Sequence, residues 1–521
     1  MAVTAVSVAL LGLVCVAHGF VPSVSPLVSA GSRLSSGRWT PHPVCTLRIR
    51  GHGSPLRMVS AGPTTTMDVL RDGIKAVAVG VNGSKPIPED LVAPLIEVIG
   101  QLDKADADVE ASERLASFLG TLFVKHEITD TDRQVLAAAS KRRPALKDVG
   151  AVREGCSAGQ ILALAGGDKS SAETQELAMK LLARETLDEA EAYRLGKRIF
   201  DVQQPSTVLS LCAQILRVRY ETPQEWRGLI KAQQETVRVG NYDGQVIRDA
   251  YRRGQDAGNR ARLVVQLAEP FDGMDRGELL TPLLAQHLQR RFNVVAVSQC
   301  GRSSGPKYGQ NLLEIATSMN ALSTPFVHSN SDMAADVEVG QVGIEPPEFG
   351  WYVDQAEVSV ELGAWVDLRR NIIKRPFLAT SEKLIDTCGA SILVASAFHP
   401  SYGDKMMTCA ETATDFKGCI VVRKGLEGTL GFGLGRNAEV MCGVRKEDNT
   451  YERMTYTFGP TDLGWDKEND VMEKKDAKET AGNIKSFSLE GSSGDPYFDK
   501  RVRLSSAGLE VGMKWIMERL Q

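Results

Sequence analysis

The first 67 residues of the chain lack aspartate, glutamate and lysine. Five arginines supply all of their formal charge, and an apolar run at 2–17 opens the chain. That run is short for a membrane span and resembles the hydrophobic region of a signal peptide that ends at small residues. We therefore expect a signal peptide over 1–19 and a Ser/Pro/Arg-rich transit segment over 20–57, with the mature protein starting near Met58.

This two-part leader, with Phe20 at its junction, resembles the presequence of an alga with a secondary plastid. It implies import into the plastid stroma, and plain secretion is the alternative. Cysteine usage argues against secretion, because the seven cysteines beyond the leader are scattered and form no Cys-x-x-Cys pair. A disulfide framework and a cysteine-ligated zinc site are therefore not expected. These cysteines are Cys156, Cys212, Cys300, Cys388, Cys409, Cys419 and Cys442.

Beyond the leader, the sequence has neither a candidate membrane span nor an excess of positive charge. No other apolar run is long enough to cross a bilayer, so no membrane contact is expected after processing. Without the five arginines of the leader, 56 basic residues remain against 65 acidic ones, a net charge of −9. A mildly acidic protein has no global electrostatic attraction to nucleic acid.

Helical periodicity dominates the first half of the mature chain. It predicts helices between 89 and 140 and a helical hairpin over 211–232, in which Thr222 is the N-cap of the second helix and Pro223 lies in its first turn. The piece TLFVKHE at 121–127 is similar to QILRVRYE at 214–221, and each precedes a polar break. We interpret this as a weak internal repeat of two small helical units.

The pattern changes after residue 240. Four short apolar runs rich in β-branched residues occur at 262–267, 294–298, 391–395 and 419–422. Helical patterns alternate with them at 279–291, 311–319, 358–373 and 405–415. This alternation predicts an α/β domain with a mainly parallel sheet covered by helices. The more polar stretches 455–465 and 474–503 are expected to be irregular.

These patterns predict three regions in the mature chain. They are an N-terminal helical region over 68–165, a second helical domain over 171–240 and a larger α/β domain over 250–521. We expect a homodimer through the helical units, because the apolar faces around Leu211, Ile215 and Trp226 require cover.

Several short motifs, taken in order, resemble anthranilate phosphoribosyltransferase and its relatives, glycosyltransferase family 3. The hairpin is similar to the family's helix ending in Leu-Arg-x-Lys-Gly-Glu-Thr. GRSSGPKYG at 301–309 resembles its Gly-Asn-Arg-Ser…Lys-Ser-Gly loop, and VDLRRNIIKRPFLATSEKL at 366–384 resembles its Arg-Lys-x-Leu-Gly-x-Arg-Thr-x-Phe-Asn segment. The likeness extends from about 173 to 520.

The resemblance implies a fold of the nucleoside phosphorylase and phosphoribosyltransferase type. It also implies phosphoribosyl transfer from phosphoribosyl pyrophosphate in tryptophan biosynthesis, with Mg²⁺ as cofactor and a homodimer as the assembly. Glu427 is the implied metal ligand. The implied substrate-binding residues are Asp272, Gly273, Thr281, Arg302, Ser303, Lys307, Gly309 and Arg375.

Three glycines of the family's phosphate loop, Gly-Thr-Gly-Gly-Asp, are missing here. The matching segment at 268–272 reads AEPFD. Pro270 lacks an N–H, Phe271 is bulky, and Glu269 adds negative charge where phosphate is expected. At the metal site the family's Asp-Glu pair reads Glu427-Gly428, so one acid is absent. Whether the chain is an active enzyme is therefore open.

Two functions remain open from the sequence. The first is a phosphoribosyltransferase, for anthranilate or for another acceptor on a shifted site. The second is a non-catalytic relative that binds a small anion or single-stranded nucleic acid. The turn SEKL at 381–384 resembles a branch of the family that lacks the glycine-rich loop and is linked to nucleic-acid binding. A structural role in plastid complexes is a third alternative, which no residue tests.

A local basic surface would serve the second function, the binding of an anion or a nucleic acid. The candidate basic residues are Arg248, Arg252, Arg253, Arg260, Arg262, Arg290, Arg291, Arg302, Lys307, Arg369, Arg370, Lys374 and Arg375.

His399, beside Pro400, is expected to be a turn or surface residue and is no catalytic candidate.

Overall fold

The computed structural model describes residues 65–80, 83–102, 107–147, 149–237, 241–269, 273–303, 308–319, 325–339 and 345–520. All of them belong to one compact unit, Gly62–Gln521. The expected signal and transit segments lie outside the described residues. None of the described helices is both long enough and apolar enough to cross a membrane.

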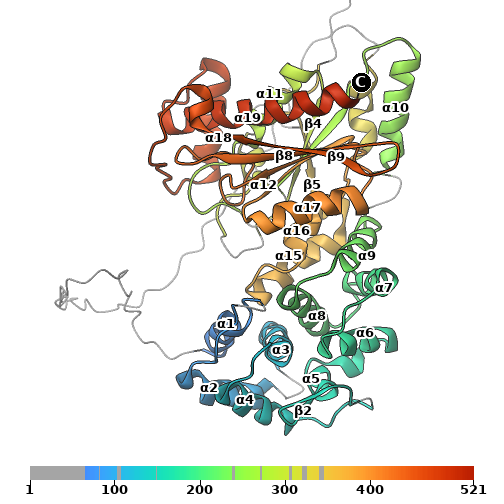
Figure 1. Cartoon of the computed structure of the whole chain (residues 1–521), viewed down its shortest axis with the longest axis vertical. Helices are drawn as coiled ribbons and strands as arrows, with labels where there is room; N and C mark the ends of the chain where they lie inside the picture. The colour runs from blue at the N-terminus through green and yellow to red at the C-terminus, as the bar shows by residue number, and fades with distance from the viewer. Residues whose placement is uncertain are drawn as a thin grey trace, which may run out of the picture. The chain divides into compact units, whose positions relative to one another are not determined.

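The first half of the described chain is helical, with one two-stranded hairpin (Figure 1). Its elements are α1 (Thr66–Val77), α2 (Glu89–Leu102), α3 (Val109–Val124), α4 (Asp130–Ser140), β1 (Val152–Arg153), β2 (Cys156–Ser157), α5 (Ala158–Leu164), η1 (Gly167–Lys169), α6 (Ala172–Leu182), α7 (Glu189–Ile199), α8 (Ser206–Arg219) and α9 (Pro223–Gln234). Thr222 is the N-cap of α9, as predicted, and forms a reciprocal capping box with Glu225.

The two pieces of the expected repeat lie in α3 and α8, which pack against each other. Each helix is followed by a buried ion pair to the next helix. Lys125, just after α3, contacts Asp132 of α4, and Arg219, at the end of α8, contacts Glu225 of α9. Both acids are also the third residue of a capping box. The two helical units therefore share the same local way of turning from one helix into the next.

The second half of the chain forms a seven-stranded sheet in the order β5-β4-β3-β6-β7-β8-β9. The strands β3 to β7 are parallel to one another, whereas β8 pairs antiparallel with both β7 and β9. Their bounds are β3 (Val264–Ala268), β4 (Val295–Cys300), β5 (Trp351–Asp354), β6 (Ile392–Ala397), β7 (Gly418–Arg423), β8 (Ala438–Arg445) and β9 (Tyr451–Phe458).

Helices cover both faces of this sheet (Figure 1). They are α10 (Gly244–Asp256), α11 (Thr281–Phe292), α12 (Leu312–Met319), α13 (Ala334–Glu338), α14 (Gln355–Val358), α15 (Val360–Ile372), α16 (Leu378–Ser381), α17 (Pro400–Ala413), α18 (Ala477–Glu490) and α19 (Pro496–Leu520), with short 3-10 turns η3 (Asn330–Met333), η4 (Glu382–Leu384) and η5 (Pro460–Leu463). In β3, Val265 and Leu267 pack into the cluster of α11 and α19, whereas Val264 and Ala268 belong to the cluster that continues into the helical half. The predicted α/β class is confirmed.

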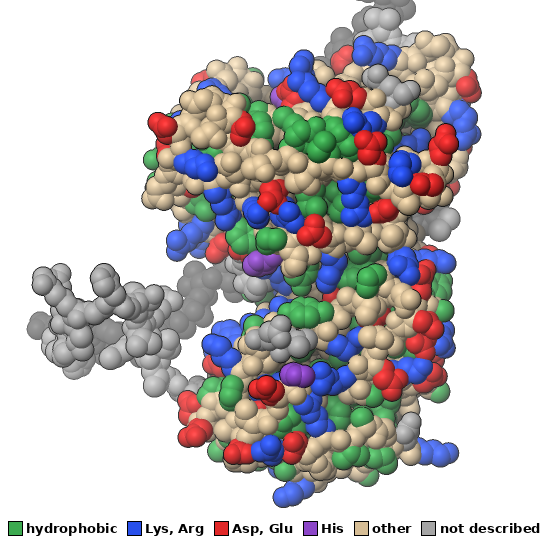
Figure 2. All heavy atoms as spheres, viewed as in Figure 1, with side chains coloured by type: hydrophobic (Ala, Val, Ile, Leu, Met, Phe, Trp, Pro, Cys, Tyr) green, Lys and Arg blue, Asp and Glu red, His purple; other side chains and the backbone are tan. Residues whose placement is uncertain are grey.

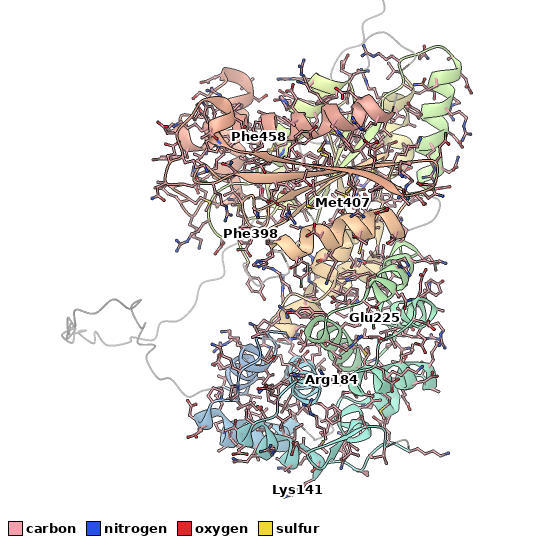
Figure 3. All side chains as sticks on the ribbon, in the orientation of Figure 1. Lys141, Arg184, Glu225, Phe398, Met407 and Phe458 are labelled. Atoms are coloured by element: carbon pink, nitrogen blue, oxygen red, sulfur yellow. The ribbon has the colours of Figure 1, made fainter. Side chains whose placement is uncertain are left out.

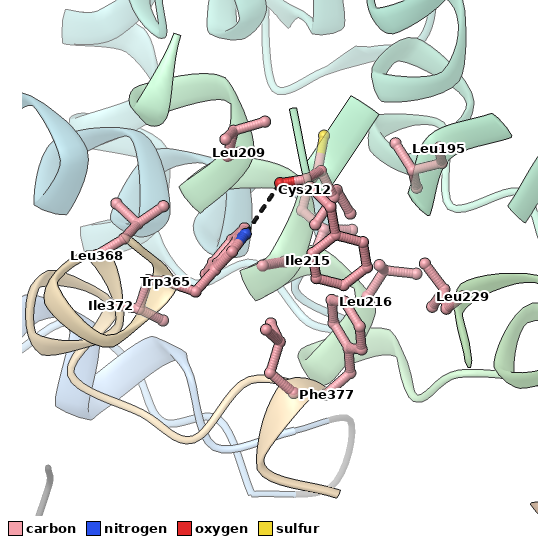
Figure 4. Packing of buried hydrophobic residues seen from close by; sticks show 14 of the residues in the cluster. Leu195, Leu209, Cys212, Ile215, Leu216, Leu229, Trp365, Leu368, Ile372 and Phe377 are labelled. Atoms are coloured by element: carbon pink, nitrogen blue, oxygen red, sulfur yellow. Dashed lines mark hydrogen bonds between the residues drawn. The ribbon is translucent and has the colours of Figure 1, made fainter. Parts of the chain in front are cut away.

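Two sequence expectations about the packing were wrong. The stretch 474–503 is not irregular, because α18 and α19 occupy most of it. The faces around Leu211, Ile215 and Trp226 need no second copy, because all three side chains are at most 1% exposed within one chain. Figure 4 shows this for Ile215: Trp365 of α15 packs among residues of α8 and donates a hydrogen bond to the Ile199 carbonyl, at 2.9 Å. Dimerisation stays a prediction, without this support.

Candidate anion-binding cleft

The carboxyl ends of the parallel strands meet at the edge of the sheet next to the helical half. The strand β3 lies between β4, which follows it in the chain, and β6, which comes after β5. After β3 the chain adds β4 and β5 on one side of β3, and then β6 and β7 on its other side, so the strand order reverses at β3. Open α/β sheets bind their ligands in the crevice at such a switch point. The loops after β3, β4, β6 and β7 all reach this edge.

The loops after β3 and β4 touch through two glycines that the sequence marked as site residues. Gly273 has a φ of +76°, and a Cβ there would lie 2.5 Å from the Gly309 carbonyl oxygen and 3.0 Å from the Ser303 hydroxyl. A Cβ on Gly309 would lie 1.8 Å from the Met274 carbonyl oxygen. Only glycine permits this approach. The structure thus brings Gly273, Ser303 and Gly309 together, while Asp272 and Lys307 lie outside the described residues.

The Thr281 hydroxyl, another predicted ligand-binding group, bonds within the protein. It donates to the carboxylate of Glu269, whose other oxygen accepts a 2.6 Å hydrogen bond from the Leu430 backbone N–H. Thr281 is the first residue of α11, where the helix dipole favours negative charge. Burial raises the pKa of Glu269, and its hydrogen bonds oppose this shift. A carboxylate of the protein itself therefore lies at this helix N-terminus.

Glu427, the implied metal ligand, contacts Arg375 at 3.1 Å. The residue beside it is Gly428, which offers no second carboxylate. Across the described part of the chain, no group of three or more His, Cys, Asp or Glu side chains is placed to hold a metal ion. Mg²⁺ needs carboxylate oxygens that are available for coordination. The described residues around Glu427 therefore do not form a Mg²⁺ site.

Arg302 and the Ser303 carbonyl contact α15, whereas the Ser303 hydroxyl faces Gly273 in the loop after β3. The Arg302 guanidinium lies 3.4 Å from both the Asp367 carboxylate and the Gly363 carbonyl oxygen. The Ser303 carbonyl accepts a 3.1 Å hydrogen bond from Arg370. Arg302 is therefore positioned against α15.

A cleft opens at the carboxyl ends of the parallel strands, and we call it the carboxyl-edge cleft. Its lining residues are Arg217, Arg375, Pro376, Ala379, Thr380, Lys383, Ser396, Ala397, Phe398, His399, Tyr402, Met406, Glu427 and Gly428. Figure 3 labels Phe398 at this edge of the sheet. The Lys383 ammonium is buried and donates to the Ser396 carbonyl at 2.7 Å. Burial raises the pKa of Tyr402.

Sequence reasoning missed two groups that shape this cleft. Arg217 comes from α8, and Tyr402 and Met406 come from the first turns of α17. The sequence treated the Arg217 region only as a helix of the hairpin. Its position before the polar break, where α8 meets the α/β half, was the signal that could have identified it. His399 is exposed at the start of α17 and lines the cleft, consistent with the expected surface residue.

The twelve candidate basic residues that the structure describes do not form one surface. Arg253 pairs with Glu338, and Arg290 contacts Glu348. Arg291 pairs with Glu510 of α19, on the face of the sheet opposite α15. Figure 2 shows the same mixture, with basic and acidic side chains interspersed over the face in view. Of the described candidates, four line a cleft at this place, on α15 and in the turn after it: Arg369, Arg370, Lys374 and Arg375.

The folds of solved proteins offer a comparison. The chain is similar to anthranilate phosphoribosyltransferases. The Thermus thermophilus enzyme has 18% identity and a TM-score of 0.46 over 66% of this chain and 90% of that one. A Saccharomyces cerevisiae variant, solved with Mg bound, has 10% identity and a TM-score of 0.47 over 67% and 90%. At such identities the likeness concerns the fold alone. No protein-family model matches the sequence, and no curated protein matches it either.

Proposed function

We propose that the protein binds a small anionic ligand with a ring in the carboxyl-edge cleft. The scaffold is of the glycosyltransferase family 3 type, and anthranilate phosphoribosyl transfer is absent or very slow. One observation carries the proposal: the cleft combines Arg217 and Arg375 with an apolar wall that includes Phe398, Tyr402 and Met406. Ligand pockets typically join apolar walls to a few convergent polar groups. An arginine fork matches a carboxylate or phosphate in two hydrogen bonds.

Catalysis by the family's route lacks two of its parts. The Glu269 carboxylate lies at the N-terminus of α11 and accepts from Thr281 and Leu430, which removes donors from an incoming phosphate. Arg375 contacts Glu427, so the remaining acid of the metal pair is already engaged. A combined loss of about 4 kcal/mol of transition-state stabilisation lowers a rate about a thousandfold.

Isothermal titration of the purified protein with anthranilate and with phosphoribosyl pyrophosphate tests the binding, with and without magnesium. We expect anthranilate to bind, and magnesium to leave its affinity unchanged. Tyr402→Ala should weaken anthranilate binding, because the anthranilate ring is expected to pack on the apolar wall to which Tyr402 belongs. Lys141→Gln serves as a control, because Lys141 is exposed just after α4, at the far end of the helical half (Figure 3).

The transfer reaction is followed by the loss of anthranilate fluorescence with both substrates and magnesium present. We expect no turnover above background. A rate near one per second would contradict the proposal and would mean that another segment holds the pyrophosphate. Absence of any anthranilate binding would contradict the assignment of the cleft.

A further inference from the structure

A second cleft adjoins the first and is lined mainly by cations. We call it the basic cleft; it shares Arg217, Arg375 and Pro376 with the carboxyl-edge cleft. Its cationic residues come from α1, α3, α8, α15 and the turn after α15, and they are Arg71, Lys75, Arg114, Arg217, Arg369, Arg370, Lys374 and Arg375. The helices α1 and α3 precede the part of the chain that resembles the transferase family. The basic cleft is therefore a joint product of the N-terminal helices and the α/β half.

Five of these cations have carboxylate partners, and three do not. Among the described residues, no Asp or Glu oxygen lies within 4.0 Å of a side-chain nitrogen of Arg114, Arg217 or Lys374. The other five form these ion pairs: Arg71 with Asp68 and Asp72, Lys75 with Asp72, Arg369 with Glu382, Arg370 with Asp367, and Arg375 with Glu427. The Nε atoms of Arg114 and Arg217 are buried and have no hydrogen-bond partner in the described structure. Buried donors of this kind are normally satisfied.

A strained turn presents Lys374. Ile373 has φ +67° and ψ −38°, and the Lys374 backbone N–H bonds the Ile372 carbonyl at 2.7 Å. This is a γ-turn of the rare positive-φ type, which a β-branched residue strongly disfavours. Backbone strain of this kind collects where a side chain has to be held for binding. The pKa of Lys374 is lowered by burial first, and then by the charges of Arg217 and Lys75.

We propose that the basic cleft binds a ligand with adjacent phosphate groups, through Lys374, Arg217 and Arg114. Three cations without carboxylate partners exceed what one carboxylate can neutralise, whereas a pyrophosphate or a phosphodiester chain supplies several charges. Guanidinium groups match phosphate oxygens in two parallel hydrogen bonds, and lysine adds a compact charge. The same chemistry is present in free pyrophosphate and in a single-stranded nucleic acid backbone.

Titration of the full protein with inorganic pyrophosphate in EDTA is the test. Lys374→Gln should weaken binding about tenfold or more, because a charge-assisted hydrogen bond is lost. Lys374→Arg should restore most of the affinity. Lys141→Gln is the matched control and should bind as the wild type does. Circular dichroism and the thermal midpoint establish that each variant is folded.

A labelled short oligothymidylate, tested in competition with pyrophosphate, identifies the source of the phosphates. Tight binding of the oligonucleotide that falls with salt indicates a nucleic acid backbone, and binding of pyrophosphate alone indicates a small ligand. Binding of either probe that is lost in the Lys374→Gln variant supports the proposal. Wild-type protein that binds neither probe, or a Lys374→Gln variant that binds as tightly as wild type, overturns it.

This proposal and the one above can fail separately. Lys374 lines only the basic cleft, and Tyr402 lines only the carboxyl-edge cleft. If pyrophosphate binding depends on Lys374 while anthranilate does not bind, the basic cleft stands and the proposed function is wrong. If anthranilate binding depends on Tyr402 while pyrophosphate binding does not depend on Lys374, the proposed function stands and the assignment of the basic cleft is wrong.

Discussion

Replacing Glu382 with glutamine should remove the carboxylate that faces a buried guanidinium. The two Glu382 oxygens accept from Arg369 Nη1 at 2.8 and 2.9 Å, and the two side chains are only 1% and 3% exposed. Gln355 also donates to this carboxylate, at 3.3 Å. The change keeps the size of the side chain and removes its charge.

Burial sets the expected magnitude. Removing one partner of a buried ion pair costs about 3–5 kcal/mol, because the remaining charge is held away from water. This is a large share of the roughly 5–15 kcal/mol by which a folded protein is stable. Replacing both Arg369 and Glu382 with leucine should recover most of the loss, because apolar side chains need no counter-charge there.

Urea denaturation followed by tryptophan fluorescence measures the free energy of unfolding. Trp365 is a suitable reporter, because it is buried on α15 one turn before Arg369. Asp249→Asn is the control: it breaks an exposed pair with Arg252 and should cost less than about 1 kcal/mol. If Glu382→Gln costs no more than this control, the reasoning from burial is refuted.

Four further outcomes are expected. Thr222→Ala should lower the free energy of unfolding by about 1 kcal/mol through loss of the α9 cap, measured by urea denaturation against Thr222→Ser. Because burial raises the pKa of Glu269, the free energy of unfolding should fall as pH rises from the ordinary carboxyl range through that raised pKa. Glu269→Gln should flatten this part of the plot of unfolding free energy against pH, and a plot that matches the wild type would contradict the prediction. Gly120→Val should cost about 1–3 kcal/mol, since even a Cβ would lie 2.9 Å from Leu211 Cγ, and wild-type stability would refute the packing. N-terminal sequencing of native protein should start near Met58, and an intact 20–57 segment would exclude processing there.

Local rules explain which elements could be predicted from sequence. The start of α9 could be predicted from Thr222 and Pro223, which lie next to each other in the sequence. Buried parallel strands such as β6 and β7 are continuous apolar runs. The strand β9 was missed because it is an edge strand with most of its side chains exposed, so it lacks an apolar pattern. The short β5 offered too few residues for any period to show.

The site was harder to predict because it depends on distant contacts. Arg71 and Arg114 read as ordinary helix-surface charges, and nothing near them in the sequence indicates that α1 and α3 bring them to Lys374. The sequence places Glu269 in the segment that resembles the phosphate loop, and its role there stays a prediction. Its burial and its bonds to Thr281 and Leu430 follow only from the tertiary structure.

The position of β3 in the sheet has a consequence for synthesis on the ribosome. β3 pairs on one side with β4, Val264 with Val295, but on the other with β6, Val265 with Ile392. The helical elements α1 to α9 are complete by Gln234, long before β6 emerges. We expect the helical half to begin folding first, since folding starts from the N-terminus as the chain is made. During that delay β3 has an open apolar edge, which is the state that chaperones protect from aggregation.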